Sequence, residues 1–280
     1  MEAAIRSLVI VVNACKSGAA ALAEELAART LAAGREVRIH SGYPLPAGLL
    51  KGADACCVIG GDGTLLSVAA EAAREGTRVL GVNMGKLGFL AMFTVEEARA
   101  FFDSFLAGDF RLSDRSLLIC RSSGGGMFCA LNDVVVRSTS SRVARLRVEA
   151  DGKLVNVYVA DGLVLSTPTG STAYNLSAGG PLIHPRAPVL AMTPICPHTL
   201  SNRGLIVGEG TLLRVSVDGG GSPVSVTSDG MPCFQDEAEG GMPVELELAP
   251  FRLPLVLRPG YTYFKLLHTK LGWSGNHLQM

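Results

Sequence analysis

The sequence predicts two domains, an N-terminal α/β domain built on a parallel sheet and a C-terminal β-sandwich domain. Up to residue 107, apolar β-branched runs alternate with helical segments, an order typical of a parallel sheet flanked by helices. From residue 108 to residue 257, short strands recur between glycine or polar breaks, which is typical of an all-β sandwich. The last segment, 258–280, is aromatic and basic, and we expect it to pack back on the α/β domain.

The composition is that of a well-buried globular protein. The chain has 280 residues, which is enough for two domains of about 100–150 residues each. Lys plus Arg and Asp plus Glu balance at 25 each, so we expect no nucleic-acid partner and no membrane-surface partner. The seven cysteines form no C-x-x-C pair, so neither a zinc site nor a disulfide framework is expected.

The apolar segments of the chain are short. None approaches the roughly 20 residues needed to span a bilayer. The first apolar run, residues 8–12, is too short for the core of a signal peptide, and Glu2 precedes it. We therefore expect a cytoplasmic protein.

In the first domain, strands are expected as short β-branched runs and helices as alanine- and leucine-rich segments with one apolar face. We expect strands at residues 5–12, 36–40, 53–59 and 78–82, and helices at residues 19–33, 65–74 and 94–106. The third strand runs directly into the sequence GGDGT (60–64). This loop is therefore placed between a strand and a helix.

In the second domain, short strands are expected between turns. We expect them at residues 116–121, 127–137, 144–150, 154–159, 205–207, 211–217, 224–227 and 243–249. Between the fourth and fifth of these lies the stretch 161–180, which opens with a further buried strand at 163–165.

The GGDGT loop has the composition of a phosphate site. Gly60 and Gly61 lack Cβ atoms, so a phosphate can approach the main chain. The N–H groups of Gly63 and Thr64 would point out of the helix start, where the helix dipole favours an anion. Asp62 could then accept a proton from an attacking hydroxyl or help to hold the Mg²⁺ that accompanies a nucleotide. The alternative is that Asp62-Gly63 is an ordinary turn.

The stretch 161–180 is rich in hydroxyl and small residues, a composition that indicates a surface for a polar ligand. Its hydroxyl residues include Ser166, Thr167, Thr169, Ser171, Thr172 and Ser177. The alternative is a Ser/Thr-rich turn between two strands. Tyr174 offers a flat face for adenine, and its alternative role is that of a core aromatic residue.

Six segments, in this order, resemble the NAD kinase family. They are GGDGT (60–64), VNMGKLGFL (82–90), LNDVVV (131–136), DGLVLSTPTGSTAYNLSAGGPLIHP (161–185), PHTLSNR (197–203) and YFKLLHTKLGWSG (263–275). The GGDGT segment is shared with diacylglycerol, sphingosine and phosphofructo-kinases. TPTGSTAY followed by LSAGGP is strongly specific for the family.

The resemblance implies phosphorylation of the 2′-hydroxyl of the adenosine ribose of NAD, giving NADP. It implies ATP with a divalent metal, Mg²⁺, as the phosphoryl donor, or inorganic polyphosphate in some members. It also implies NAD in a cleft between an α/β domain and a β-sandwich domain, and a homo-oligomer, either a dimer or a tetramer.

The same resemblance implies roles for individual residues. Asp62 matches the catalytic aspartate that takes the proton from the 2′-hydroxyl, and Gly63 would lie beside the ribose. The other implied substrate contacts are Asn132, Asp133, Arg142, Asp161, Thr172, Ala173, Tyr174, Asn175, Leu176 and Ser177, and the phosphate contacts are Gly60, Gly61, Gly63 and Thr64. The chain departs from the family pattern at Asp133, where glutamate is usual, and at Val159, where many members carry an arginine associated with the choice between NAD and NADH.

Two other functions compete with this hypothesis. A lipid kinase of the GGDGT group would phosphorylate sphingosine or diacylglycerol and ignore NAD. A non-catalytic nucleotide-binding module would keep the fold but carry a damaged GGDGT loop. The TPTGSTAY stretch argues against the lipid kinase, and the intact Asp62 argues against the non-catalytic module.

Overall fold

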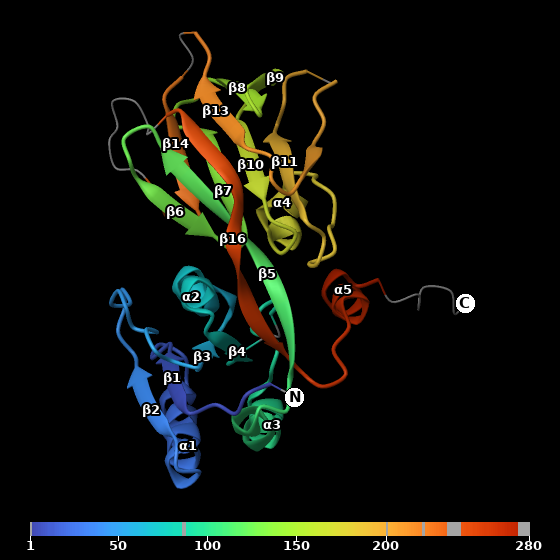
Figure 1. The fold of residues 1–280 in the computed structure, drawn as a ribbon. Coiled ribbons are helices and arrows are strands. Elements are labelled where there is room, and N and C mark those ends of the chain that lie inside the picture. Colours follow the sequence, from blue (N-terminus) through green and yellow to red (C-terminus); the bar gives the residue numbers. More distant parts are fainter. Residues whose placement is uncertain (1, 86–87, 200, 220–221, 234–241, 274–280) are drawn as a thin grey trace, which may run out of the picture. The chain divides into compact units, whose positions relative to one another are not determined.

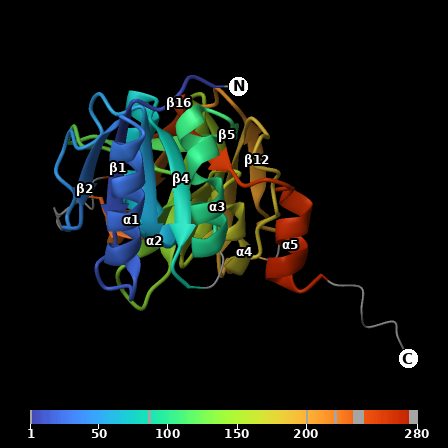
Figure 2. The same cartoon turned by 90° about the horizontal axis from the view of Figure 1, so that it is seen from below.

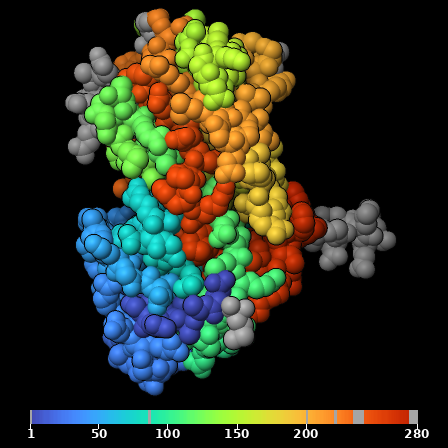
Figure 3. All heavy atoms as spheres, in the orientation of Figure 1, coloured from blue at the N-terminus to red at the C-terminus, as the bar shows by residue number. Residues whose placement is uncertain are grey.

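The computed structural model describes residues 2–85, 88–199, 201–219, 222–233 and 242–273. The chain forms two compact units, unit 1 with residues 1–113 and 253–280, and unit 2 with residues 114–252. Two long strands, β5 (Arg111–Ser122) and β16 (Val244–Leu257), run from one unit into the other. The colours along the chain let each unit be followed in Figures 1 and 3.

Unit 1 is an α/β unit with parallel strands in the order β2-β1-β3-β4, and the end of β16 adds to β4 through Leu255 and Val79. Its strands are β1 (Ser7–Val12), β2 (Glu36–His40), β3 (Ala55–Gly60) and β4 (Arg78–Asn83). Its helices are α1 (Ala19–Ala32), α2 (Asp62–Glu75), α3 (Val95–Ala107) and α5 (Tyr263–Leu271).

Helices α1 and α3 lie side by side, as Figure 2 shows, and surface ion pairs such as Arg29–Asp103 (2.7 Å) join them. The central strand β3 is buried along its whole length, in keeping with a parallel sheet that helices cover.

The carboxyl ends of the parallel strands meet at one edge of the sheet. Val12 of β1 pairs with Ile59 of β3, and Gly60 pairs with Asn83 of β4, so the strands end level with each other. Helix α2 begins at Asp62, three residues earlier than expected, because the extended backbone of Gly61 (φ −168°) serves as its N-cap. The first turn of this helix therefore lies at the edge where open α/β sheets bind their ligands.

Unit 2 contains a six-stranded antiparallel sheet in the order β12-β11-β10-β7-β14-β15. These strands are β12 (Leu205–Gly208), β11 (Val189–Ile195), β10 (Gly162–Ser166), β7 (Asp133–Ser138), β14 (Val224–Ser228) and β15 (Met231–Pro232). A second layer is formed by β16 and β5 with β6 (Met127–Ala130), β8 (Ala144–Ala150), β9 (Lys153–Ala160) and β13 (Leu213–Val217).

The inner faces of the two layers share one core. Alternate residues of β7, β8 and β10 enter it, among them Val134 and Val136, Leu146 and Val148, and Leu163 and Leu165. This two-residue period is that of strands with one buried face, and the predicted β-sandwich is confirmed. The expected single strand at 127–137 is instead two strands, β6 and β7, with a turn at Leu131–Asn132 between them.

Among the described residues, no helix has both the length and the apolar character needed to cross a bilayer, since the longest, α1 and α2, have 14 residues each.

Candidate functional site

The carboxylate of Asp62 is held by three consecutive backbone N–H groups. Its Oδ2 accepts from Phe89 (2.9 Å), and its Oδ1 accepts from Leu90 (3.1 Å) and Ala91 (2.8 Å). Gly88 makes this approach possible, because a Cβ there would lie 2.6 Å from Cγ of Asp62. We call residues 88–91 the carboxylate loop. This loop fixes a half-buried, negatively charged group in one orientation.

The start of α2 presents Asp62 beside free backbone donors. The first intrahelical bond runs from the N–H of Leu65 to the carbonyl of Gly61 (3.1 Å), so the N–H groups of residues 62–64 have no acceptor within the helix. Apart from the adjacent backbone, no atom of the described residues lies within 4 Å of a Cβ built on Gly61 or Gly63. A phosphate could therefore reach these amides at the positive end of the helix dipole.

Gly60 has a different reason to be glycine. A Cβ there would meet the hydroxyl oxygen of Thr64 and lie 3.1 Å from Cβ of Asn13. Its missing side chain therefore makes room for Thr64, whose hydroxyl accepts a hydrogen bond from Nδ2 of Asn13 (3.4 Å). We expected Gly60 to be a phosphate contact, and the structure gives it a packing role beside the site.

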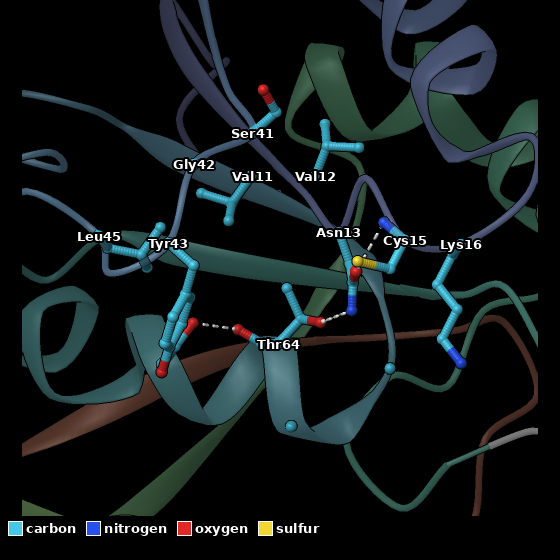
Figure 4. Close-up of a pocket in the computed structure, with 13 residues that line it drawn as sticks. Val11, Val12, Asn13, Cys15, Lys16, Ser41, Gly42, Tyr43, Leu45 and Thr64 are labelled. Atoms are coloured by element: carbon cyan, nitrogen blue, oxygen red, sulfur yellow. Dashed lines mark hydrogen bonds between the residues drawn. The ribbon is translucent and has the colours of Figure 1, made fainter.

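A cavity of about 550 Å³ opens at this end of the sheet, and Figure 4 shows the residues that line it. Its polar lining includes the start of α2 and the segment after β1, and its apolar lining comes from Val11 and Val12 of β1 and from the loop after β2. We call it the donor cavity, after the phosphoryl donor that the sequence predicts, and its lining residues include Asn13, Cys15, Lys16, Tyr43, Leu45, Gly61, Gly63, Thr64 and Ser67. Lys16 brings a positive charge, and Asn13 is held in turn by the N–H of Cys15 (3.1 Å).

Sequence reasoning missed Asn13, Lys16 and Tyr43 as site residues, and it missed the carboxylate loop. Asn13 and Lys16 could have been found, because they follow a buried parallel strand at the edge where the GGDGT loop lies. Lys270 of α5 also approaches the site, with its Nζ 5.8 Å from the ring centroid of Phe89.

Unit 2 has its own polar cavity, of about 440 Å³, which we call the acceptor cavity after the acceptor nucleotide that the sequence predicts. It is lined by Asn132, Asp133, Val135, Arg137, Ala173, Tyr174, Ser225, Thr227, Asp229 and Gly230. Asp133 is only 6% exposed, and burial, reinforced by the charge of Asp229, raises the pKa of its carboxyl to about 7. Burial also raises the pKa of Asp229, although hydrogen bonds from three backbone N–H groups oppose this shift. The cavity thus contains two carboxyl groups that disfavour each other's ionisation.

Most hydroxyls of the stretch 161–180 bind the chain itself. Thr167 Oγ1 donates to the carbonyl of Leu131 (2.6 Å) and accepts from the N–H of Gly170 (3.1 Å). Ser171 Oγ donates to the carbonyl of Pro168 (2.7 Å) and accepts from the N–H of Ile183 (2.9 Å). Both side chains are fully buried. These hydroxyls therefore shape the loop and do not form the ligand surface that we expected.

Asn175, which we expected to contact the substrate, has a structural role as well. Its side chain is fully buried, donates to the carbonyl of Pro181 (3.0 Å) and accepts from the hydroxyl of Thr193 (2.7 Å). This anchor fixes two short helices, η1 (Gly170–Thr172) and α4 (Tyr174–Ser177). The anchored loop presents Ala173 and Tyr174 to the acceptor cavity.

The remaining predicted residues lie in two places. Arg142, Asp161 and Val159 line a third cavity, of about 890 Å³, together with His198. Thr172, Leu176 and Ser177 lie on η1 and α4, beside the residues that line the acceptor cavity.

The residues present fit a metal that arrives with a nucleotide. Among the described residues, no group of three or more His, Cys, Asp or Glu side chains could hold a metal ion. Mg²⁺ commonly uses only one or two carboxylates and completes its shell with waters and phosphate oxygens. Asp62, next to the glycines that line the donor cavity, can supply such a single carboxylate.

Comparison with known proteins identifies related sequences and folds. Residues 46–110 match the model of the ATP-NAD kinase N-terminal domain, and residues 131–246 match that of the ATP-NAD kinase C-terminal domain. The NAD kinase of Geotalea daltonii is 41% identical over 227 residues, which cover 79% of each chain. The NAD kinase of Syntrophotalea carbinolica is 42% identical over 226 residues, again 79% of each chain.

Two solved structures share the fold. Yeast NADH kinase complexed with NADH superposes with a TM-score of 0.80, covering 97% of this chain and 89% of that one. An NAD kinase from Archaeoglobus fulgidus in complex with ATP superposes with a TM-score of 0.78, covering 96% and 100%. Each is 23% identical to this chain, so the likeness shows a common fold.

Proposed function

Because the chain belongs to the NAD kinase family, we propose that this enzyme transfers the γ-phosphoryl group of ATP to the 2′-hydroxyl of the adenosine ribose of NAD, giving NADP. The observation that carries the proposal is the fixed carboxylate of Asp62, which stands at a helix start with open phosphate-binding amides. Phosphoryl transfer depends on positioning and charge neutralisation more than on covalent chemistry, and this arrangement offers both.

Asp62 acts as the general base through Oδ2. Within the described residues, Oδ1 accepts two N–H groups and Oδ2 accepts one, so Oδ2 keeps a lone pair for the ribose hydroxyl. The proton passes to Oδ2 as the ribose oxygen bonds to the γ-phosphorus, and the bond to the bridging oxygen breaks to release ADP. This requires the ribose oxygen to come within about 2.6–3.2 Å of Oδ2 in the complex.

ATP binds in the donor cavity. Its volume, about 550 Å³, lies within the usual range for small-ligand sites. Lys16 and the amides of Gly61 and Gly63 receive the phosphates, and Mg²⁺ neutralises further phosphate charge when bound. Tyr43 and Leu45 form an apolar part of the lining, which suits a base and favours ATP over polyphosphate as the donor. The structural neighbour from Archaeoglobus fulgidus is described as an ATP complex, which supports this assignment.

NAD binds through unit 2. Tyr174 and Ala173 offer a surface for adenosine in the acceptor cavity, where Asn132 and Asp133 supply polar contacts. Thr172, Leu176 and Ser177 support the same surface from η1 and α4. Arg142 and Asp161 offer charges for the remainder of the dinucleotide in the third cavity. The homo-oligomer and the cytoplasmic location stay predictions.

The test is a coupled assay in which glucose-6-phosphate dehydrogenase reports NADP formed from NAD and MgATP. Asp62→Asn should lower kcat by about 10²–10⁴-fold, because the base is lost while the shape is kept. The matched control is Asp54→Asn in the same unit, since Asp54 also accepts two backbone N–H groups (2.7 and 3.0 Å) and lines none of the three cavities described above. Absence of NADP with wild-type protein would overturn the function, and full activity of Asp62→Asn would remove Asp62 as the base.

A further inference from the structure

Asp229 binds the turn between β6 and β7 with four hydrogen bonds. Its Oδ2 accepts from the N–H of Leu131 (2.8 Å), and its Oδ1 accepts from the N–H groups of Asn132 (2.8 Å) and Asp133 (3.2 Å). Its own N–H donates to the carbonyl of Asp133 (2.9 Å). A residue almost a hundred positions later in the chain therefore fixes Asn132 and Asp133, two of the residues that line the acceptor cavity.

The backbone of Asp229 is in the left-handed region, with φ at 48°. This conformation is uncommon for residues other than glycine, although aspartate tolerates it better than most. This backbone conformation places the carboxylate of Asp229 opposite the three consecutive N–H groups of residues 131–133. Gly230 follows with φ at 81°, so the chain turns away sharply after the carboxylate.

Asp133 lines the acceptor cavity, and its carboxylate oxygens remain open to a ligand there. Within the described residues, no protein group donates a hydrogen bond to its oxygens, whereas the Asp229 oxygens receive three N–H groups. Among the described residues, the charged side chains that line the cavity around Asp133 are Asp229, in the turn after β14, and Arg137, on β7. The Asp133 carboxylate is thus available to a ligand, and its ionisation is coupled to Asp229.

We propose that Asp229 is a positioning residue for the acceptor nucleotide, holding Asn132 and Asp133 at the cavity wall so that the carboxylate of Asp133 accepts a hydrogen bond from the nucleotide. This inference rests on the proposed function. An ionised Asp133 accepts hydrogen bonds from hydroxyl or amino groups of the nucleoside, and a protonated one accepts them poorly. Binding of NAD therefore strengthens as the pH rises through 7, where Asp133 loses its proton.

The main test compares Asp229→Asn with wild type. The dissociation constant for NAD is measured by calorimetry between about pH 5.5 and 8.5, and KM and kcat are measured in the coupled assay. In Asp229→Asn, the amide NH₂ replaces one acceptor and the negative charge is lost, so NAD should bind about tenfold more weakly at pH 7.5. The pKa of Asp133 should fall, and the pH midpoint of NAD binding should move to lower pH. The value of kcat should change by less than about twofold, because the base in unit 1 is untouched.

Two further variants separate geometry from charge. Asp229→Glu keeps the negative charge but misplaces it, so the dissociation constant should rise while the pH midpoint stays near that of wild type. Asp151→Asn is the matched control, because Asp151 also has a positive φ (49°), and its Oδ1 accepts the N–H of Leu212 (3.0 Å) away from the cavity. It should change neither the dissociation constant nor the midpoint.

An unchanged NAD affinity and midpoint in Asp229→Asn would overturn the proposal. If Asp229→Asn does not fold, Asp133→Asn decides, because the pH dependence of NAD binding seen in wild type must then disappear, and its persistence would refute the coupling. Calorimetry also distinguishes a failure of the proposed function from a failure of the role of Asp229. Wild-type protein that binds NAD but makes no NADP would overturn the proposed function and leave the role of Asp229 testable.

Discussion

The carboxylates of Asp62 in unit 1 and Asp229 in unit 2 are both held by backbone N–H groups of a loop. The two differ in whether the carboxylate or the loop is the part proposed to act on the substrate. Each carboxylate accepts the N–H groups of three consecutive residues, 89–91 for Asp62 and 131–133 for Asp229. In the proposed function, the carboxylate of Asp62 is the reacting group and the loop supports it. In our proposal for Asp229, the loop carries the nucleotide contacts and the carboxylate supports the loop.

The two sites reach this arrangement by different backbone solutions. Asp62 lies in regular helix and needs a glycine opposite it, because a Cβ on Gly88 would occupy the place of the carboxylate. Asp229 needs no such space and adopts a left-handed backbone instead. A carboxylate bound by three amides is therefore not by itself a sign of catalysis. What distinguishes Asp62 is its place at a helix start with free amides beside a cavity.

The largest expected effect comes from removing the space around Asp62. Gly88→Ala would push the carboxylate out of its loop, and a displacement of about 1 Å at a reacting group can cost about 100-fold in rate. We expect kcat in the coupled assay to fall by at least that factor. Gly85→Ala is the control, because a Cβ there would lie 3.7 Å from its nearest neighbour, Oδ1 of Asn83. Wild-type kcat in Gly88→Ala would show that the loop does not fix the base.

The arrangement around Asp62 could be predicted only in part. The strand–loop–helix position of GGDGT followed from local patterns, since β3 is a continuous apolar run and α2 has an apolar face. The carboxylate loop lies 27 to 29 residues from Asp62, and Asp229 lies 96 to 98 residues from the turn it holds. Hydrogen bonds over such separations leave no period in the sequence, so neither support was foreseen.

The hydroxyl-rich stretch shows a second limit. Its composition suited both a ligand surface and a turn, and the choice depends on which way each hydroxyl points. The hydroxyls of Thr167 and Ser171 face the protein interior, where they form hydrogen bonds with backbone groups of residues 131, 168, 170 and 183.

Strand β11 was not predicted from the sequence, because Pro194 interrupts its apolar run.

The second-largest expected effect tests whether unit 2 contributes to NAD binding and not to the phosphoryl-transfer step. Tyr174→Ala removes the aromatic face from the acceptor cavity, so we expect KM for NAD to rise about tenfold with little change in kcat. Tyr174→Phe keeps the ring and should resemble wild type. Steady-state kinetics with varied NAD at saturating MgATP provide the measurement. A fall in kcat with unchanged KM would contradict the assignment of acceptor binding to this surface.

A smaller effect is expected in the donor cavity of unit 1. Lys16→Met removes a positive charge from its lining and should raise KM for ATP about fivefold, because an exposed charge contributes only about 1 kcal/mol. The KM for NAD should not change, in contrast to Tyr174→Ala. Lys51→Met, at another exposed lysine of unit 1, is the control. Equal effects of Lys16→Met on both substrates would remove the distinction between donor and acceptor cavities.

The smallest expected effect concerns stability. It is expected at the Asp229 site, where a second buried carboxyl group, that of Asp133, lies nearby. Burial and the charge of Asp229 raise the pKa of Asp133 from 3.8 to about 7 in the folded protein. The folded state therefore holds a proton that the unfolded state releases, so the stabilisation is complete below about pH 4 and is lost as the pH rises through 7.

The side chain that Asp133→Asn introduces cannot ionise. The melting temperature of this variant should therefore exceed that of wild type at pH 8 by about 2–4 °C for each kcal/mol of repulsion removed. The difference should shrink at pH 5, where wild-type Asp133 is already neutral. Thermal melts at both pH values give the measurement, and a gain that is equal at pH 5 and pH 8 would show that the repulsion between Asp133 and Asp229 is not its cause.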